Sequence, residues 1–235
     1  ATLGRVCTHA CEIDCFRGRF DDAVAIRALK RHMAEEAEDP AAALPEAQPA
    51  LGVKIAVVGA GPSGLSCAYQ LARQGYHVDV FEKEAAAGGM MRYGIPAYRL
   101  PHEVLEQEIA LLDLYDIEIK LNHPVRDVNA LLADGYAAVY VATGCGVGNM
   151  LKVPGSEAAG ITSASDFLHR VNSGEQVEIA GRVAVIGSGN VAVDAARTAC
   201  RLGAAEVHVL TLEHTDYRAH DHLTAQEEEY KQAVA

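Results

Sequence analysis

The chain has 235 residues, of which 50% are hydrophobic and 22% charged, the composition of a soluble globular protein with one large domain or two small ones. Its formal net charge is −12 and no lysine- or arginine-rich stripe interrupts this acidic balance, so we do not expect nucleic acid as a partner. No apolar run approaches the roughly 20 residues that span a bilayer, and no signal-peptide pattern is present. We therefore expect no membrane span and a cytoplasmic location.

Three of the six cysteines lie close together near the start of the chain, at Cys7, Cys11 and Cys15. This spacing would place three thiols on one face of a helix, or spread them around a metal cluster from an irregular loop. In a cytosolic chain it suits an iron–sulfur cluster or zinc better than disulfides. No fourth cysteine is nearby, and His9 is the one histidine close to the three. Either the missing ligand lies outside this chain or the site is incomplete. Zinc, or simply reduced buried thiols, stay open as alternatives.

An amphipathic helix is predicted next, because Val24, Ile26, Leu29 and Met33 recur at near-helical spacing beside basic residues. We assign residues 1–33 to a small helical segment that carries the cysteines. Residues 34–52 contain three prolines and many alanines, which predicts an extended linker.

From residue 53 the pattern becomes α/β. The apolar strand VKIAVVG leads into a glycine turn and a helix, and the strand YHVDVFE and the glycine-rich GGMMRYGIP follow. Pro101 opens another helix, after which come the short strands IEIKL and AAVYVAT. Apolar strands that alternate with helices predict a parallel sheet, and we assign residues 53–145 to this domain.

The first glycine turn has the spacing of a dinucleotide-binding fingerprint. Gly59 permits the tight turn, Gly61 lets backbone amides approach a pyrophosphate, and Gly64 lets the helix pack closely on the strand. Glu82 ends the next strand, where a carboxylate can accept hydrogen bonds from a ribose diol. Strand, turn, helix and acid together favour a nucleotide site over a turn kept only for packing.

A second unit of the same kind follows a connecting segment, residues 146–180, whose helix we expect to begin after Ser163 or Ser165. In residues 181–235 a strand leads to the turn Gly187-Ser188-Gly189-Asn190-Val191-Ala192, with alanine as an accepted final residue. We expect its helix to run from Asp194 to Leu202. Strand, turn, helix and helix-ending glycine match those of the first unit, which indicates a repeated fold element.

The strand of the second unit is predicted to end in Glu213. When the two units are aligned, Thr211 stands at the position of Glu82, and Glu213 lies two residues on, on the same side of the strand. A carboxylate there favours a ribose hydroxyl and repels a 2′-phosphate, so NAD(H) is expected in preference to NADP(H). Arg218 could counter this preference, and a degenerate site without nucleotide is the alternative.

These motifs resemble those of one flavoprotein family, represented by the small subunit of bacterial glutamate synthase and the N-terminal half of dihydropyrimidine dehydrogenase. The family's iron–sulfur segment resembles GRVCTHACEIDCFRG followed by VAIRALKR. Its FAD, flavin-proximal and nicotinamide motifs resemble, in the same order, VVGAGPSGL, GGMMRYGIPAYRLP with VATG, and VIGSGNVAVDAAR. The resemblance covers nearly the whole chain.

The resemblance implies an α/β fold of two Rossmann-like, glutathione-reductase-like units, the second truncated, after a helical cysteine-containing segment. It implies a hydride step between NAD(P)H and FAD, and electron transfer through iron–sulfur clusters to other subunits of a redox complex. Cys7, Cys11 and Cys15 would ligate a [4Fe-4S] cluster. The residues that would contact FAD are Gly59, Gly61, Pro62, Ser63, Gly64, Glu82, Lys83, Gly89, Met90 and Thr143. Those that would contact the pyridine nucleotide are Gly187, Gly189, Asn190, Val191 and Glu213.

The sequence also departs from the family. Members usually carry two arginines after the second nucleotide strand, which suit NADP, whereas this chain has Leu212 and Glu213. The return of the chain to the FAD domain is absent, so we expect these residues to be a piece of a longer polypeptide. Two other functions stay open: a glutamate synthase small subunit that uses NADPH, and a non-enzymatic scaffold or electron conduit with vestigial nucleotide sites.

Overall fold

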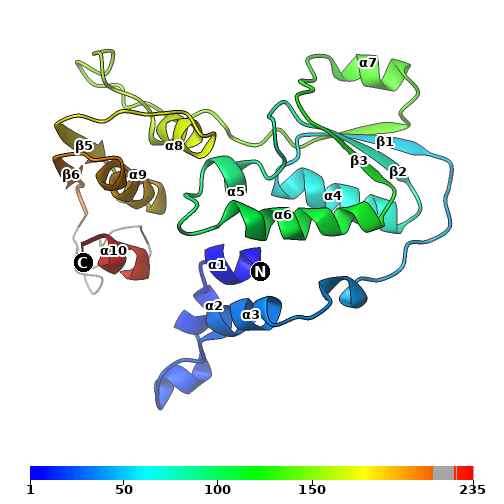
Figure 1. Cartoon of the computed structure of the whole chain (residues 1–235), viewed down its shortest axis with the longest axis horizontal. Helices are drawn as coiled ribbons and strands as arrows, with labels where there is room; N and C mark the ends of the chain where they lie inside the picture. Colours follow the sequence, from blue (N-terminus) through cyan, green and yellow to red (C-terminus); the bar gives the residue numbers. More distant parts are fainter. Residues whose placement is uncertain (214–224, 226, 235) are drawn as a thin grey trace. The chain divides into compact units, whose positions relative to one another are not determined.

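The computed structural model describes residues 1–213, 225 and 227–234, and these form two compact units (Figure 1). The first unit comprises Ala1–Arg92 and Ala97–Gly144, and the second comprises Tyr93–Pro96 and Cys145–Ala235. In the described residues, no helix has the length and apolarity that crossing a bilayer requires.

A parallel four-stranded sheet forms the centre of the first unit, as the apolar strand pattern predicts. Its order is β3-β2-β1-β4, and the strands are β1 (Lys54–Val58), β2 (His77–Phe81), β3 (Ile117–Lys120) and β4 (Ala138–Val141). Four consecutive residues of β1 and of β2 are buried. Such continuous burial requires that helices cover both faces of these strands.

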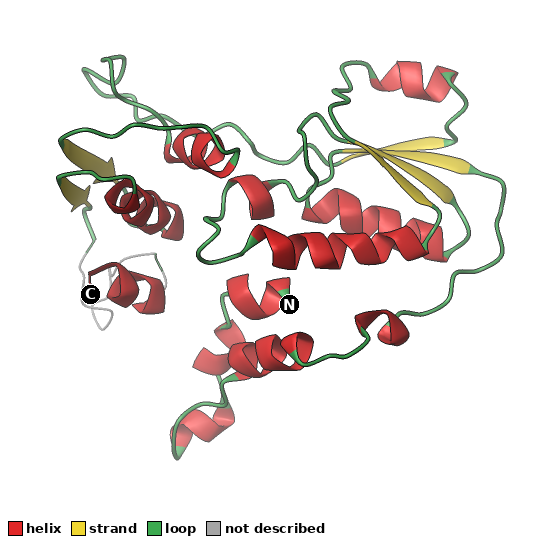
Figure 2. Ribbon diagram, viewed as in Figure 1, coloured by secondary structure: helices red, strands yellow, loops and turns green. Residues whose placement is uncertain are grey.

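Helices do cover both faces of this sheet (Figure 2). On one face, α4 (Pro62–Arg73) packs Leu65 and Ala68 against Val57, Val78 and Val80 of the central strands. On the other, Leu131 of α7 (Val128–Ala133) joins a smaller cluster of Ala56, Val58 and Phe81. The alternating side chains of each strand thus pack into two separate cores, one on each face of the sheet.

The cysteine-containing segment is part of the first unit. It forms α1 (Thr2–Val6), α2 (Ala10–Ile13) and α3 (Ile26–Glu35), and α1 contacts both α3 and α6 (His102–Ala110). The predicted amphipathic helix is α3, although it begins at Ile26 and leaves Val24 outside. Its apolar face is open, since Leu29 and Met33 are 51% and 72% exposed.

The second unit repeats the strand, turn and helix of the first. Its parallel pair is β5 (Arg182–Ile186) and β6 (Glu206–Leu210), and the helices are α8 (Ala164–Asn172), α9 (Asn190–Arg201) and α10 (Glu227–Val234). Ser163 caps α8, because its Oγ accepts the N–H of Asp166 at 3.0 Å. In the first unit, the short helix α5 (Met90–Tyr93) follows the segment after β2.

Two predicted boundaries in the second unit are wrong. The helix begins at Asn190 and not at Asp194, because Gly189 already has the extended backbone of a helix N-cap. The strand ends at Leu210, so Glu213 lies beyond it. The argument that Thr211 and Glu213 share one side of a strand therefore does not apply.

One buried carboxylate lies within the first sheet. Asp79 of β2 is 1% exposed, and it accepts a hydrogen bond from the Tyr136 hydroxyl at 2.5 Å. The Lys120 ammonium lies 3.0 Å from Asp79 Oδ1. Burial opposes ionisation of Asp79, but the hydroxyl and the ammonium outweigh it and hold the pKa of this carboxyl below its usual value.

Replacing Lys120 with methionine should therefore destabilise the fold. The change leaves a buried carboxylate without its ammonium, at a cost of about 1–3 kcal/mol after allowance for the partly exposed lysine. Because the pKa of Asp79 is lowered in the folded state, this contribution exists above the usual carboxyl pKa and disappears as the pH falls through the lowered value. Urea denaturation should show the deficit at neutral pH and a smaller one in acid.

The matched control is Glu118→Gln, since Glu118 also faces Lys120 but its side chain is 62% exposed. It should cost less than about 1 kcal/mol. Equal losses for the two variants would contradict the central role of Asp79.

Candidate functional site

The two glycine turns are held in the same way. Gly59 follows β1, and its N–H donates to the carbonyl of Phe81 at the end of β2, at 2.8 Å. Gly187 follows β5, and its N–H donates to the carbonyl of Leu210 at the end of β6, at 3.0 Å. The predicted repetition of the turn is thus present in three dimensions, at the carboxyl ends of parallel strands, where α/β folds bind ligands.

Two glycines of the first turn are required by close backbone contacts. Gly59 has φ +106°, and a Cβ there would lie 2.4 Å from the carbonyl oxygen of Ala142. A Cβ on Gly64 would lie 1.8 Å from the carbonyl oxygen of Gly59. No side chain fits at either position, so the strand, the turn and α4 are locked together.

Gly61 differs from these two glycines, because the fold itself leaves room for a side chain there. Its backbone is extended, with φ −78°, and a Cβ would meet only the Cα of Gly89, at an ordinary 3.8 Å. Gly61 is also the N-cap of α4, whose first N–H groups and dipole favour an anion. The open space beside Gly61 therefore suits the close approach of a pyrophosphate.

Glu82 lies against this turn. It is 5% exposed, its Oε2 accepts the N–H of Ala60 at 2.6 Å, and its Oε1 accepts the N–H of Glu84 at 3.0 Å. The backbone thus orients the carboxylate beside the tip of the turn, which is where a ribose diol would be bound. Sequence reasoning missed Ala60, whose contribution is a backbone N–H and carries no side-chain signal.

The other predicted residues of the first site lie around the same turn. Pro62 and Ser63 begin α4, and the Ser63 hydroxyl lies 3.0 Å from the Tyr140 hydroxyl. Thr143 follows β4, and its backbone N is 3.3 Å from the place of a Cβ on Gly59. The remaining two point outward: Lys83 is exposed beside Glu84, and Met90 is 42% exposed at the start of α5.

The second turn is slightly more spacious. Gly187 has φ +142°, and a Cβ there would lie 3.5 Å from the Cβ of Ala192, an ordinary contact. Alanine in the final position is therefore compatible with close packing of α9. Gly189 is the N-cap of α9, and Asn190 and Val191 form its first turn, with Val191 50% exposed.

Glu213 reaches the second turn although it lies beyond β6. The Thr211 hydroxyl donates to its carboxylate, and the Ser188 side chain of the turn is near enough to help lower its pKa. The Thr211 hydroxyl is the main cause of a lowered pKa at Glu213, so this side chain is ionised at neutral pH. Ser188 was not among the predicted site residues, and Arg218 lies outside the described residues.

The three cysteines do not lie on one continuous helix, so that alternative is wrong. Cys7 follows α1, Cys11 lies in α2 and Cys15 comes after it. Backbone N–H groups point at two of the sulfurs. His9 N–H donates to Cys7 Sγ at 3.4 Å, and backbone N–H groups, that of Val24 first, lower the pKa of Cys15. The lowered pKa of Cys15 favours its thiolate, the form that binds metal.

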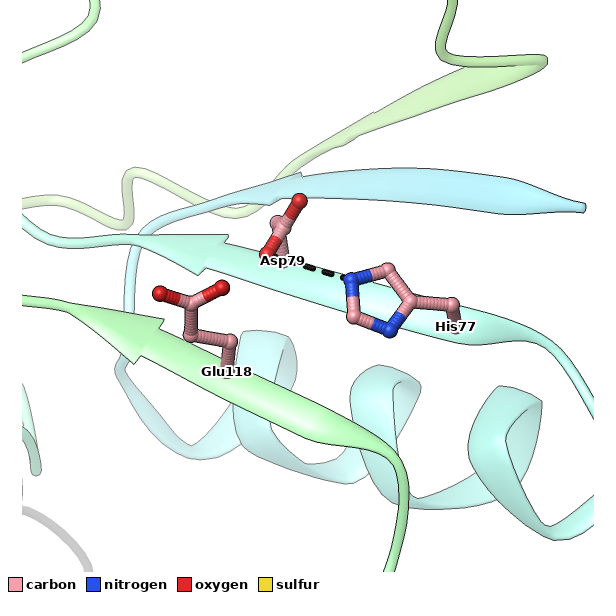
Figure 3. A group of neighbouring side chains, drawn as sticks. All are labelled: His77, Asp79 and Glu118. Carbon is pink, nitrogen blue, oxygen red and sulfur yellow. Dashed lines mark ion pairs between the residues drawn. The ribbon is translucent and has the colours of Figure 1, made fainter.

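One group of three potential metal ligands lies on the first sheet, formed by His77, Asp79 and Glu118 (Figure 3). It is the one such group in the described part of the chain whose ligand atoms lie within 4.8 Å of one another. The Lys120 ammonium already lies 3.0 Å from Asp79 and 3.5 Å from Glu118. We assign the group to the charge network of the sheet.

Residues 53–232 match the pyridine nucleotide-disulphide oxidoreductase family. The β subunit of NADP(+)-dependent formate dehydrogenase from Moorella thermoacetica is 40% identical over 235 residues, which cover 88% of this chain and 33% of that protein. The PreT subunit of NAD-dependent dihydropyrimidine dehydrogenase from Escherichia coli (strain K12) is 34% identical over 223 residues, which cover 91% of this chain and 54% of that protein. The chain thus spans about a third and about half of these relatives' lengths.

A solved structure shares the fold. FprA of Mycobacterium tuberculosis, in complex with NADPH, aligns with a TM-score of 0.62 and 21% identity, over 80% of this chain and 48% of that one. Together with the parallel sheets, this match confirms the predicted fold class.

Replacing Gly61 with alanine should separate folding from cofactor binding at the first turn. Because a methyl group fits the ligand-free fold, the free energy of unfolding of the stripped protein should change by less than about 0.5 kcal/mol. FAD affinity should fall at least about ten-fold, because the methyl group occupies the space of the pyrophosphate. Equilibrium flavin-fluorescence titration and urea denaturation measure the two effects.

Gly146→Ala is the control, since Gly146 has open space around it and no positive φ. Its FAD affinity should be that of the original protein. Unchanged affinity in Gly61→Ala would show that no pyrophosphate lies beside this residue.

Proposed function

This chain belongs to the pyridine nucleotide-disulphide oxidoreductase family, and we propose that it is the electron-entry part of an NADH-linked flavin and iron–sulfur enzyme. The observation that carries the proposal is the pair of equivalent glycine turns, each with a carboxylate against its tip. Two dinucleotide sites in one chain fit a protein that holds both a flavin dinucleotide and a pyridine dinucleotide.

We assign FAD to residues 53–145 and the pyridine nucleotide to residues 181–235, with residues 146–180 as the connection. In the first site, Gly61 leaves room for the pyrophosphate and the N-terminus of α4 favours its charge. Glu82 is already oriented to accept hydrogen bonds from the ribose. Gly59, Gly64, Gly89 and Thr143 shape the backbone around it. We assign Pro62 and Ser63 at the start of α4, and the exposed Lys83 and Met90, as further FAD contacts.

When bound, FAD would accept a hydride from the nicotinamide and release single electrons to an iron–sulfur cluster. The chain's own residues hold the two nucleotides by backbone N–H groups, helix N-termini and the carboxylates Glu82 and Glu213. Positioning, and not proton transfer by a side chain, is thus the role we assign to the protein.

In the second site, Gly187, Gly189, Asn190 and Val191 would contact the nucleotide, and Glu213 would select NAD(H). The names of the two relatives mention different nucleotides, NADP(+) for the formate dehydrogenase subunit and NAD for the PreT subunit. The choice in this chain therefore rests on Glu213. Because its carboxylate is ionised, it can accept a hydrogen bond from a ribose hydroxyl, whereas it would repel a 2′-phosphate.

We assign a [4Fe-4S] cluster to the cysteine-containing segment, residues 1–33, with Cys7, Cys11 and Cys15 as ligands and at least one further ligand from outside it. The backbone donors around Cys7 and Cys15 support this, since metal-bound cysteine sulfurs commonly accept such hydrogen bonds. Both relatives are named as subunits, which supports a place for this chain in a multisubunit redox complex. Its unpaired cysteines suit the reducing cytoplasm.

Replacing Cys15 with serine should remove the cluster and leave the flavin. Iron content and the broad iron–sulfur absorbance should fall by more than about half, because a hydroxyl is a poor ligand for this metal. Flavin absorbance should be retained, because the glycine turns are untouched. The control is Cys145→Ser at an exposed cysteine outside the cluster segment, which should keep both chromophores. A full iron complement in Cys15→Ser would remove this residue from the ligands.

Replacing Glu213 with arginine should shift nucleotide preference. The change removes the repulsion of a 2′-phosphate and adds a charge-assisted donor, so the ratio of kcat/KM for NADPH to that for NADH should rise at least about ten-fold. Dye reduction under anaerobic conditions measures the ratio. Glu206→Arg, at an exposed glutamate at the start of β6, is the control for added charge. An equal shift in the two variants would mean that Glu213 does not contact the ribose.

A further inference from the structure

The internal repeat extends beyond the strands and the glycine turns. In the first unit, the N–H of Gly88 donates to the carbonyl of Ala60, the middle residue of the turn, at 2.8 Å. In the second, the N–H of Ala225 donates to the carbonyl of Ser188, again the middle residue, at 2.7 Å. A helix begins two residues later in each case, α5 at Met90 and α10 at Glu227. Ala225 and the start of α10 therefore correspond to Gly88 and the start of α5.

A buried charged residue follows at the same place in both units. Arg92 lies four residues after Gly88, and Glu229 lies four residues after Ala225. They are 8% and 7% exposed. Arg92 pairs with Glu106 of α6 at 2.9 Å, and Glu229 pairs with Arg197 of α9 at 3.3 Å. In each unit, the residue that donates to the glycine turn is thus followed by a helix, and an ion pair joins that helix to a neighbouring one.

The ion pair of the second unit is well shielded. The side chains of Arg197 and Glu229 are 12% and 9% exposed, and the second amino group of Arg197 lies 3.5 Å from Oε1 of Gln232. Because α9 begins at the nucleotide turn, the pair ties α10 to the helix that carries the turn. Removing one partner of a shielded pair leaves an uncompensated buried charge, so it disturbs the contact between the two helices more than breaking an exposed pair does.

Ser188 connects this arrangement to the predicted ribose contact. Its carbonyl accepts the N–H of Ala225 at 2.7 Å, and its side chain is near enough to the Glu213 carboxylate to help lower the pKa of that group. A cavity of about 380 Å³ lies beside the turn, with Ser188, Thr211 and Arg197 in its lining and α10 as part of its wall. A shift of α10 would therefore change both the turn and the space next to it.

We propose that Arg197 and Glu229 are positioning residues of the pyridine-nucleotide site: their ion pair holds Ala225 on Ser188, and so sets the placement of the Ser188 hydroxyl and the Glu213 carboxylate. The inference rests on the proposed function of the second turn. Neither residue touches the nucleotide in this account, and both act through the position of the turn.

The test is Glu229→Gln, which removes the charge and keeps the shape. KM for NADH should rise at least about five-fold while kcat stays within about two-fold, because binding is lost and the chemical step is untouched. The preference for NADH over NADPH should weaken at the same time, because the Glu213 carboxylate is no longer held in place. The control is Glu175→Gln, which breaks the exposed Arg170–Glu175 pair of the same unit and should leave KM and the preference unchanged.

An unchanged KM and an unchanged preference in folded, flavin-loaded Glu229→Gln would overturn the inference. If that variant does not fold, the double variant Arg197→Met/Glu229→Leu replaces the pair with apolar side chains of similar volume, and the same criteria decide. The original protein is measured first with both nucleotides. If neither reduces its flavin, the proposed function fails; if it is active and the variants match it, only the positioning role fails.

Discussion

Backbone-to-backbone contact at the first glycine turn is the constraint on which the rest of the structure depends. The carbonyl of Gly59 leaves no space for a side chain on Gly64, and the carbonyl of Ala142 leaves none on Gly59. These contacts bring the N-terminus of α4 to the carboxyl ends of the strands, and there its N–H groups can meet an anion. A side chain on Gly61 would meet no such contact, so packing does not require glycine there. The space that a side chain would fill is open to a ligand instead.

A carboxylate lies against the tip of each turn, but the two are held differently. Glu82 is fixed by backbone N–H groups within the first unit's core. Glu213 accepts a hydrogen bond from the Thr211 hydroxyl and lies near the Ser188 side chain, beyond the end of its strand. Side-chain hydroxyls are easier to change by mutation than a backbone, so the second site, which we propose for the pyridine nucleotide, is the more adjustable of the two. This difference fits a family whose members are named for either NAD or NADP.

The sequence predicts the strands, the turns and their repetition because these features depend on local spacing of apolar residues and glycines. It mislocates the start of α9 and the end of β6, since helix and strand ends are decided by single backbone conformations such as that of Gly189. The contact of Ala225 with Ser188 is hidden, because it joins backbone atoms of residues far apart in the chain. The irregular path through Cys7, Cys11 and Cys15 was one of two equally compatible outcomes of their spacing.

We propose that electrons enter at the second turn, pass to a flavin at the first and continue to a cluster on the cysteine-containing segment. Anaerobic mixing of the purified protein with NADH, followed by visible absorbance, tests it most directly. The account predicts that the flavin bands bleach and the iron–sulfur shoulder then declines without any added mediator. A protein that carries neither chromophore, or a flavin that stays oxidised in excess NADH and NADPH, would contradict it.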